Sequence, residues 1–299
     1  MKFFVAIYPG DAKFHNFLSP ENFNYGYLYS ISSFNSENIM KHFEGFTGDV
    51  IIDAGSFKFI DKENLPISQK QVLLKQIKLA KKLVTANRII ICHLDFPLKL
   101  DQSEREMRKR INITLENAME FKSLFNTFNF NGKVYSMGII QGYDEESIRS
   151  CYEILKDLDF DFYGIGGLAM LVQTAVGKWR VALKRIEYII ELLGKRSKNL
   201  HIFGVNNLKI LQKIGECRMN IHSIDSSSPT KAAFNSRIFI NGRQKDFRKM
   251  NTSSLKCACP VCVQLKEKVL LRGKKIYNNI RAIHNLYDLL MTLNFRSGI

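Results

Sequence analysis

Three cysteines lie close together near the C-terminus of the chain, in the spacing C-x-C-x₂-C. They are Cys257, Cys259 and Cys262. Three thiolates on so tight a loop can occupy three corners of a tetrahedron, and structural zinc takes a fourth protein ligand. His284, within an apolar pattern typical of a helix, is the favoured fourth ligand, and His222 and Cys217 are the alternatives. Four ligands leave no open position, so we predict one structural Zn²⁺ per chain.

An iron–sulfur cluster is disfavoured because only three thiolates are clustered and a histidine is available nearby. The other three cysteines, at positions 92, 151 and 217, are scattered along the chain, unlike a secreted disulfide framework. We therefore expect a reducing, cytoplasmic compartment.

A second group of reactive side chains follows short apolar runs, at the points where predicted strands end. Three of these side chains are carboxylates, Asp53, Asp95 and Asp225. Neighbouring carboxylates can divide the roles of nucleophile and general acid or base. Each aspartate could instead be a turn residue or a helix N-cap, where aspartate is common. The whole set favours catalysis, because the carboxyl ends of barrel strands meet at one mouth.

An amide, bare glycine backbone and an aromatic ring accompany these carboxylates at other strand ends. They are Gln141, Gly166, Gly167 and Phe57. Glycines leave backbone N–H and C=O groups free to approach a planar ligand, and a phenylalanine ring offers a stacking face. These patterns alone predict a barrel enzyme with carboxylate chemistry.

Short runs rich in Ile, Val, Phe and Tyr alternate with longer helical patterns. Nearly continuous apolar runs are typical of strands buried on both faces of a parallel sheet. The predicted strands are 3–8, 50–53, 88–95, 134–141, 160–166, 200–205 and 221–225, and the predicted helices are 68–86, 103–125, 144–158, 171–193 and 207–214. Ser103 and Glu106 have the spacing of a capping box.

This alternation predicts a (β/α)₈ TIM-type barrel, with an open doubly wound sheet as the alternative. We expect residues 1–235 to form the catalytic barrel. Residues 236–299 would form a zinc-binding subdomain with a C-terminal helix that completes the barrel. In this part we expect a hairpin arm at 236–242, a basic segment at 243–249 and a helix at 277–294.

The net charge of +16 favours polyanionic partners, nucleic acid first and an anionic membrane surface second. A solvated basic surface is the bland alternative. No apolar run approaches the roughly 18 residues of a membrane span, so we expect no membrane association. The apolar run at the N-terminus is cut by Pro9-Gly10-Asp11, too early for a signal peptide.

In this order, the strand-end segments resemble the tRNA-guanine transglycosylase superfamily from about residue 50 to 295. Residues 53–57 (DAGSF) are similar to the motif D-S-G-G-F/Y, and Asp95 falls where the family has a base-recognising aspartate. The other matching segments are 138–142 (GIIQG), 166–169 (GGLA), 204–205 (GV), Asp225 with 229–231 (PTK), and the cysteine loop with His284-Asn285.

The resemblance implies exchange of a guanine in nucleic acid for a free 7-deazaguanine base. Asp225 would attack C1′ of the nucleoside and hold the sugar covalently, and Asp53 would act as general acid and base. Phe57 would stack on the base, which must leave its helix to be reached. The residues that would read the purine edge are Asp95, Gln141, Gly166, Gly167 and Leu168.

Several sequence differences from the tRNA enzymes of the family indicate which nucleic acid, DNA or tRNA, is the substrate. Lys58 replaces a family glutamine, Lys231 replaces an arginine, and the short segment 60–64 stands where tRNA enzymes have a longer one. The first catalytic aspartate comes early, and we expect no appended RNA-binding domain. This compact pattern is similar to the DNA-guanine transglycosylases of phages and bacterial modification islands (DpdA-like). DNA is therefore the expected polymer and tRNA the alternative.

Basic residues near the C-terminus are expected to track phosphates, although a solvated surface explains them as well. They are Lys231, Arg243, Lys245, Arg248 and Lys249, followed by Lys266, Lys268, Arg272, Lys274 and Lys275.

Two other function classes compete. Intact Asp53 and Asp225 disfavour a non-catalytic zinc-dependent nucleic-acid-binding protein. The zinc pattern and the positive charge disfavour a small-molecule glycosidase with paired carboxylates. The family often forms dimers, so a homodimer is possible.

Overall fold

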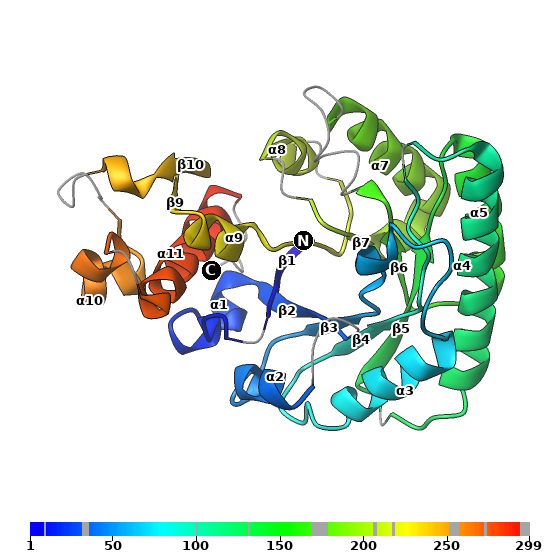
Figure 1. Cartoon of the computed structure of the whole chain (residues 1–299), viewed down its shortest axis with the longest axis horizontal. Coiled ribbons are helices and arrows are strands. Elements are labelled where there is room, and N and C mark those ends of the chain that lie inside the picture. Colours follow the sequence, from blue (N-terminus) through cyan, green and yellow to red (C-terminus); the bar gives the residue numbers. More distant parts are fainter. Residues whose placement is uncertain are drawn as a thin grey trace.

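The structure is a computed structural model that describes residues 1–8, 10–31, 36–99, 101–130, 132–168, 179–205, 208–216, 219–250, 257–271 and 274–293. Eight parallel strands form a closed barrel, each paired with the next along the chain, and β8 pairs with β1 (Figure 1). The strands are β1 (Lys2–Ala6), β2 (Tyr25–Ser30), β3 (Val50–Asp53), β4 (Ile89–Cys92), β5 (Val134–Ile140), β6 (Phe162–Ile165), β7 (Leu200–Ile202) and β8 (Ser223–Ser226). The predicted (β/α)₈ barrel is confirmed, and the open sheet is wrong.

Strand β2 is absent from the sequence prediction, which placed only seven strands. Its sequence, Tyr-Gly-Tyr-Leu-Tyr-Ser, alternates tyrosine with smaller residues and lacks a run of Ile or Val. Tyr27 is buried on the outside of the barrel and stacks on Phe46 with ring centroids 4.1 Å apart. Gly26 faces the interior, where a Cβ atom would lie 2.5 Å from the ring of Phe4. Tertiary packing therefore makes a strand of a segment with little apolar periodicity.

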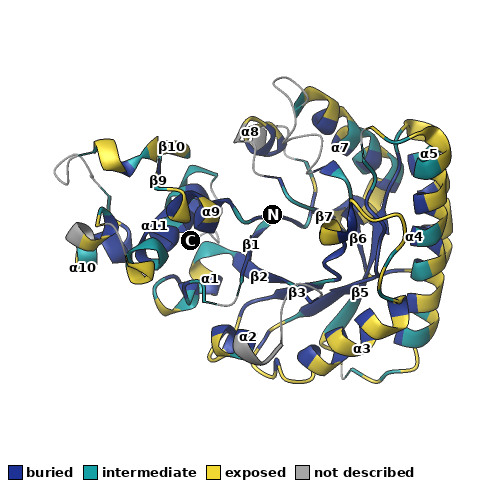
Figure 2. Ribbon diagram, in the orientation of Figure 1, coloured by how far each residue is buried: buried dark blue, intermediate teal, exposed yellow. Residues whose placement is uncertain are grey.

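Helices surround the barrel, with buried inner faces and exposed outer faces (Figure 2). They are α1 (Pro20–Phe23), α2 (Ser36–Phe43), α3 (Gln69–Ala80), α4 (Glu104–Phe125), α5 (Glu145–Asp157), α7 (Trp179–Leu193) and α8 (Leu208–Glu216), with the 3₁₀ helices η1 (Phe14–Asn16), η2 (Ser56–Phe59) and η3 (Gly194–Asn199). The predicted cap of α4 forms only in part. Ser103 accepts from the N–H of Glu106 at 3.3 Å, but the Glu106 carboxylate accepts from Arg110 Nε instead. The first residues of the helix predicted at 171–193, and Ala169, lie outside the described residues.

The chain continues after the barrel into a group of elements beside α1 (Figure 1). These are α9 (Ser228–Phe234), the antiparallel pair β9 (Arg237–Ile240) and β10 (Arg243–Asp246), η4 (Phe247–Lys249), α10 (Pro260–Val269) and α11 (Lys275–Thr292). Helix α11 packs against α9, α10 and β9. Its Arg281 is buried over the Phe247 ring, 3.8 Å from the centroid, and donates to the carbonyl of Val269 at 2.6 Å. The predicted hairpin is longer than expected, since its second strand takes in the first half of the basic segment.

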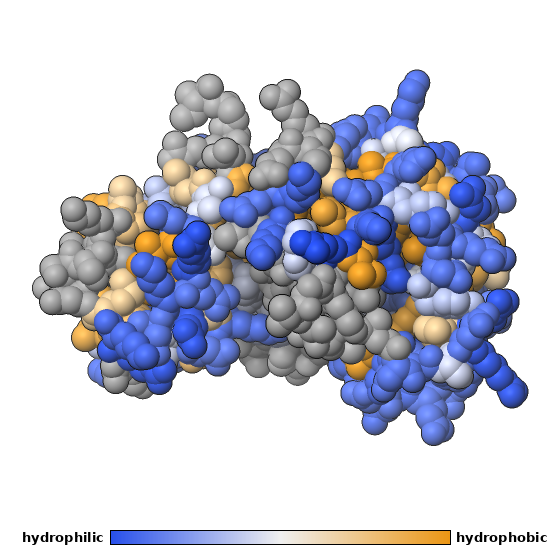
Figure 3. Space-filling model, turned by 90° about the horizontal axis from the view of Figure 1, so that it is seen from above, coloured by the Kyte–Doolittle hydropathy of each residue, from blue (hydrophilic) through white to orange (hydrophobic). Residues whose placement is uncertain are grey.

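The visible face in Figure 3 is mostly hydrophilic, with apolar residues scattered across its described part. Among the described helices, none combines the length and the apolar run needed to cross a bilayer.

Candidate active site

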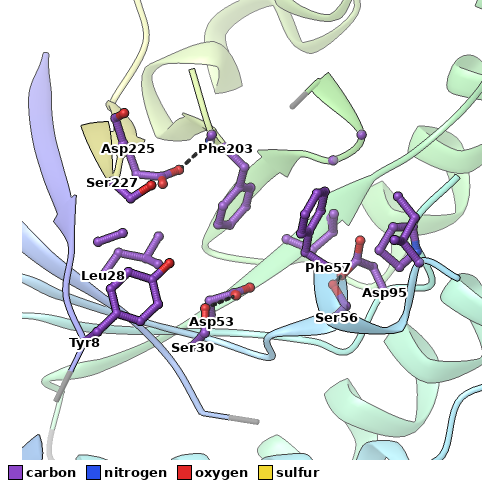
Figure 4. A pocket seen from close by; sticks show the side chains of 18 of the residues that line it. Tyr8, Leu28, Ser30, Asp53, Ser56, Phe57, Asp95, Phe203, Asp225 and Ser227 are labelled. Atoms are coloured by element: carbon purple, nitrogen blue, oxygen red, sulfur yellow. Dashed lines mark hydrogen bonds between the residues drawn. The ribbon is translucent and has the colours of Figure 1, made fainter. Parts of the chain in front are cut away.

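A pocket with a volume of about 210 Å³ opens at the carboxyl ends of the barrel strands. Asp53, Asp95 and Asp225, which end or follow three different strands, all line it. Asp225 and Tyr8 lie toward one end of the pocket, Phe57 and Asp95 toward the other, and Asp53 between them (Figure 4). The three carboxylates therefore meet at one mouth of the barrel, as the sequence predicted.

Asp225 lies on β8 and is almost fully buried. Its Oδ1 accepts from the backbone N–H of Gly204 at 2.7 Å and lies 3.3 Å from Nε2 of His201. Gly204 can aim its N–H this way because it adopts a left-handed backbone, with φ of 68°. Both contacts are made to the same oxygen, Oδ1, and neither engages Oδ2.

Asp53 ends β3, and its Oδ2 accepts from Ser30 Oγ at 2.8 Å and from the N–H of Gly55 at 3.0 Å. Burial raises the pKa of the Asp53 carboxyl, and the charge of Asp225 adds to that rise. A carboxyl whose pKa is raised toward neutrality is suited to give and take protons. Ser30 belongs to β2, so this contact could not be foreseen without that strand.

Asp95 follows β4 and is held by Ser56 Oγ and Gln141 Nε2, which donate to its two oxygens. Burial raises its pKa to about 6 despite these two hydrogen bonds. Gln141 is also buried, and its Oε1 has no hydrogen-bond partner among the described residues. A buried acceptor without a partner is costly, and a ligand N–H would satisfy it.

Two glycines complete this end of the pocket. A Cβ atom on Gly166 would lie 3.0 Å from Cγ of Gln141, so a larger residue would press on the amide. Gly167 has φ of 75°, in the left-handed region that favours glycine. Both residues line the pocket and present backbone to it.

The two apolar residues assigned to base recognition differ in position. Phe57 lies in η2 at the pocket and is 51% exposed, which leaves a ring free to cover a ligand. Leu168 is buried in the core between barrel and helices and is not among the pocket-lining residues. Its side chain therefore supports the loop from behind.

Several pocket residues were not assigned to the site from the sequence. They are Tyr8, Leu28, Ser30, Phe203 and Ser227. Tyr8 follows β1, and Phe203 follows β7, so the rule that found the aspartates also covers them. Aromatic and apolar residues at strand ends resemble core residues in sequence and carry no separate signal.

The predicted metal ligands are brought together beside α11. Nδ1 of His284 lies 3.4, 3.6 and 3.2 Å from the Sγ atoms of Cys257, Cys259 and Cys262. Tetrahedral zinc with ordinary Zn–S and Zn–N bonds has ligand–ligand separations of about 3.5–3.8 Å. His284 Nε2 lies 2.8 Å from the carbonyl oxygen of Phe239, which turns Nδ1 toward the thiols. The four residues could therefore hold a metal ion.

The alternative fourth ligands are not at this cluster. His222 directly precedes β8, and its Nδ1 is 2.7 Å from Ser223 Oγ. Cys217 lies outside the described residues, as do Arg272 and the side chain of Lys266.

Wherever the structure describes the side chains of the basic residues assigned to nucleic acid, they are exposed, and one of these described residues lines the pocket. Lys231, on α9, is among the lining residues. Arg243 and Lys245 lie on β10, and Arg248 and Lys249 on η4. Further along the chain, Lys268 lies on α10, and Lys274 and Lys275 lie at the start of α11. Arg248 is engaged with Asp246, 2.5 Å away.

Comparison with known proteins finds a match to a family of transglycosylases. The family described as queuine tRNA-ribosyltransferase matches residues 29–294. A tRNA-guanine(15) transglycosylase of Methanosarcina mazei is 22% identical over 250 residues, which cover 81% of this chain and 46% of the relative. A queuine tRNA-ribosyltransferase of Helicobacter acinonychis is 25% identical over 291 residues, covering 87% of this chain and 74% of the relative. The chain thus spans about half the length of its archaeal relative.

Proposed function

The chain belongs to the queuine tRNA-ribosyltransferase family, and from that membership we propose that it exchanges a guanine in nucleic acid for a 7-deazaguanine base. The observation that carries the proposal is the pair Asp225 and Asp53, held in one pocket as hydrogen-bond acceptors. Two carboxylates with different environments can divide nucleophilic and proton-transfer roles. The first is held by a backbone N–H, and the second has a raised pKa.

In the first half-reaction, Oδ2 of Asp225 attacks C1′ of the nucleoside while the C1′–N9 bond breaks. The electron pair of that bond leaves with the guanine, which takes a proton from Asp53. The sugar is then held as an ester of Asp225. In the second half-reaction, the incoming base gives its N9 proton to Asp53 and attacks C1′, and the carboxylate of Asp225 leaves.

Recognition of the base is assigned to the other end of the pocket. Guanine offers N–H donors on its N1 and N2 edge, and the carboxylate of Asp95, which lines the pocket, would accept from them. Gln141 is buried beside Asp95 and is not itself a lining residue, so its Oε1, unpartnered among the described residues, would accept from the base only where the base reaches past Asp95. The backbone of Gly166 and Gly167 would meet the O6 side, and Phe57 would cover the ring. A base extruded from its strand is held in this way by edge hydrogen bonds and stacking.

Two nucleic acids, tRNA and DNA, are candidates for the polymer in which the base is exchanged. The relatives are named for tRNA, which favours tRNA. The short segment 60–64 and the replacements Lys58 and Lys231 are the sequence features that favour DNA. DNA as the substrate and a DpdA-like affiliation remain predictions from those features. Lys231, at the pocket, would meet the backbone of either polymer.

We also propose that the Cys₃His cluster holds one structural zinc ion, that residues 236–299 form the subdomain around it, and that the protein works in the cytoplasm. The donor set supports the first of these, since three thiolates and an imidazole suit zinc and leave it no open position. A homodimer remains a prediction.

The test of the proposed function supplies radiolabelled guanine, and separately a 7-deazaguanine, with tRNA, duplex DNA and single-stranded DNA in parallel. We expect label to enter one polymer and to need the intact protein. Label in tRNA alone would overturn the DNA prediction. If no polymer is labelled while nucleic acid is still bound, the non-catalytic binding protein becomes the better description.

The pKa of Asp95 predicts a pH dependence of base binding. Above a pKa of about 6 the carboxylate is ionised and accepts from the base, and below it the carboxyl is protonated and loses that capacity. The KM for the free base should therefore rise by about tenfold per pH unit below pH 6. Asp95→Asn, which cannot titrate, should have a raised KM that no longer changes between pH 5 and 7. A wild-type KM that is flat over this range contradicts the assignment.

Replacing Phe57 with alanine tests the stacking face. Base–aromatic stacking contributes about 1–3 kcal/mol, so the KM for the base should rise roughly tenfold to a hundredfold. The free energy of unfolding should hardly change, because the ring is 51% exposed. Phe57→Tyr, which keeps a ring, is the matched control and should stay near the wild-type value. Equal KM values for the alanine and tyrosine variants would exclude stacking by this residue.

A further inference from the structure

The interior of the barrel is mostly apolar, and a line of polar side chains on β7 and β8 runs through it. Residues such as Phe4, Ile51, Ile90, Met137 and Phe162 fill it. Between them, His201 on β7 and Ser223 on β8 are fully buried and paired across the two strands. The rings of Phe4 and Phe203 meet His201 edge-on, at centroid distances of 5.8 and 4.3 Å. Two buried polar residues in such a setting need hydrogen-bond partners.

Those partners form a continuous chain of hydrogen-bonded side chains, here called the file, which runs from the pocket to the opposite end of the barrel through Asp225, His201, Ser223, His222 and Arg88. Asp225 Oδ1 lies 3.3 Å from His201 Nε2, and His201 Nδ1 lies 2.8 Å from Ser223 Oγ. Ser223 Oγ lies 2.7 Å from Nδ1 of His222. Nε2 of His222 lies 3.5 Å from a guanidinium nitrogen of Arg88, the residue that precedes β4.

Arg88, at the far end of the file, is held in place by a buried carboxylate. Its guanidinium donates twice to Asp49 Oδ2, at 2.7 and 3.2 Å, and Asp49 is fully buried. Lys2 donates to the same oxygen at 2.6 Å. The file therefore begins at an ion cluster at the amino ends of the strands and ends at the Asp225 carboxylate.

The chemistry of the two ends sets the direction of every hydrogen bond between them. A guanidinium can only donate, and a carboxylate can only accept. His222 Nε2 must then accept from Arg88, so the proton of this imidazole is on Nδ1, which donates to Ser223. The Ser223 hydroxyl donates to His201 Nδ1, and His201 Nε2–H donates to Asp225. Burial and the charge of Arg88 lower the pKa of His222 to about 3, which keeps it neutral.

We propose that Arg88, His222, Ser223 and His201 are positioning residues that fix the tautomers of both histidines and direct the His201 N–H at one oxygen of Asp225. Together with the N–H of Gly204, this bond immobilises Oδ1 and leaves Oδ2 to meet the sugar carbon. The same two donors receive the negative charge when Asp225 leaves C1′ in the second half-reaction. The kinetic part of this proposal rests on the proposed function, whereas the tautomer assignment does not.

The tautomers can be read without any substrate, by ¹⁵N NMR of protein labelled in histidine, with each signal assigned by single substitutions. At pH 7.5 we expect His201 as the neutral Nε2–H form and His222 as the neutral Nδ1–H form, opposite tautomers in one file. In Arg88→Met, His222 should no longer be held as Nδ1–H. Arg196→Met is the matched control, because this arginine bonds Tyr163 at the same end of the barrel and does not touch the file.

The proposal fails if both histidines share one tautomer, if His201 is an imidazolium, or if Arg196→Met shifts the signals as Arg88→Met does. None of these outcomes depends on exchange activity. If the file is found but no base is exchanged, the proposed function is wrong and the tautomer assignment stands.

The kinetic consequence is tested with two replacements of similar size. The amide nitrogen of His201→Gln can reach the place of Nε2 and still donate to Asp225, whereas that of His201→Asn can reach only the place of Nδ1. Loss of one charge-stabilising donor costs about a hundredfold or more in kcat. We therefore expect about a hundredfold lower kcat with unchanged KM for the asparagine variant, and within about tenfold of wild type for glutamine. Equal losses in two variants of equal Tm would overturn the positioning role.

Discussion

Asparagine at position 225 is expected to lower the rate of base exchange by at least about a thousandfold. The carboxylate oxygen that faces the pocket becomes part of a neutral amide, which is too weak a nucleophile to displace guanine from C1′. The remaining carboxylates, Asp53 and Asp95, are held by their own hydrogen bonds and cannot take its place. The measurement is incorporation of labelled base under single-turnover conditions, together with trapping of the sugar ester.

Binding of nucleic acid should survive this change, because the pocket wall and Lys231 remain. The amide oxygen of asparagine can still accept from Gly204, so the Tm should shift by only a few degrees. Asp157→Asn, at the exposed end of α5, is the matched control and should exchange bases at the wild-type rate. Full activity in Asp225→Asn would remove the nucleophile assignment, and loss of both binding and Tm would show a structural role instead.

The part of this site that could be predicted depends on one property of parallel barrels. Every strand ends at the same mouth, so polar residues that follow apolar runs can be placed together without knowing any distance. Asp53, Asp95 and Asp225 were found in this way, and all three line the pocket. The cysteine loop was found because its ligands are close in sequence, and His284 because it lies on a helix that can return to the loop.

The remaining parts of the fold and of the site depend on contacts between distant segments, and no pattern in the sequence indicates those contacts. The tyrosine-rich strand β2 has no Ile or Val run, and its loss from the prediction also hid Ser30, a partner of Asp53. His201 lies between Leu200 and Ile202, and Ser223 follows His222, so nothing in either segment marks a contact between the two. The register of β7 and β8 pairs them. Leu168, a motif residue assigned to the base, has a buried side chain that does not line the pocket, which its place in the motif does not reveal.

The cysteine cluster is linked to the pocket through the side chain of Asn285, the residue next to His284. Its neighbour Asn285 is fully buried, accepts from the N–H of Phe239 at 2.8 Å and donates to the carbonyl of Pro229 at 3.0 Å. Pro229 lies on α9, the helix that carries Lys231 to the pocket. A change at the metal should therefore reach the pocket rim without altering any residue there.

Native protein should contain about one zinc ion per chain by elemental analysis, and Cys259→Ser should contain little or none. Structural zinc contributes roughly 10–16 kcal/mol in small zinc-dependent domains, so loss of one thiolate should lower the free energy of unfolding by at least about 3 kcal/mol. Cys151→Ser, a buried cysteine on α5 outside the cluster, should keep its zinc. Because Asn285 couples α11 to α9, the metal-free variant should also bind nucleic acid more weakly, and added zinc should not restore it. A fully stable native protein without metal would show that the four ligands hold their positions by packing alone, and the zinc proposal would then fall.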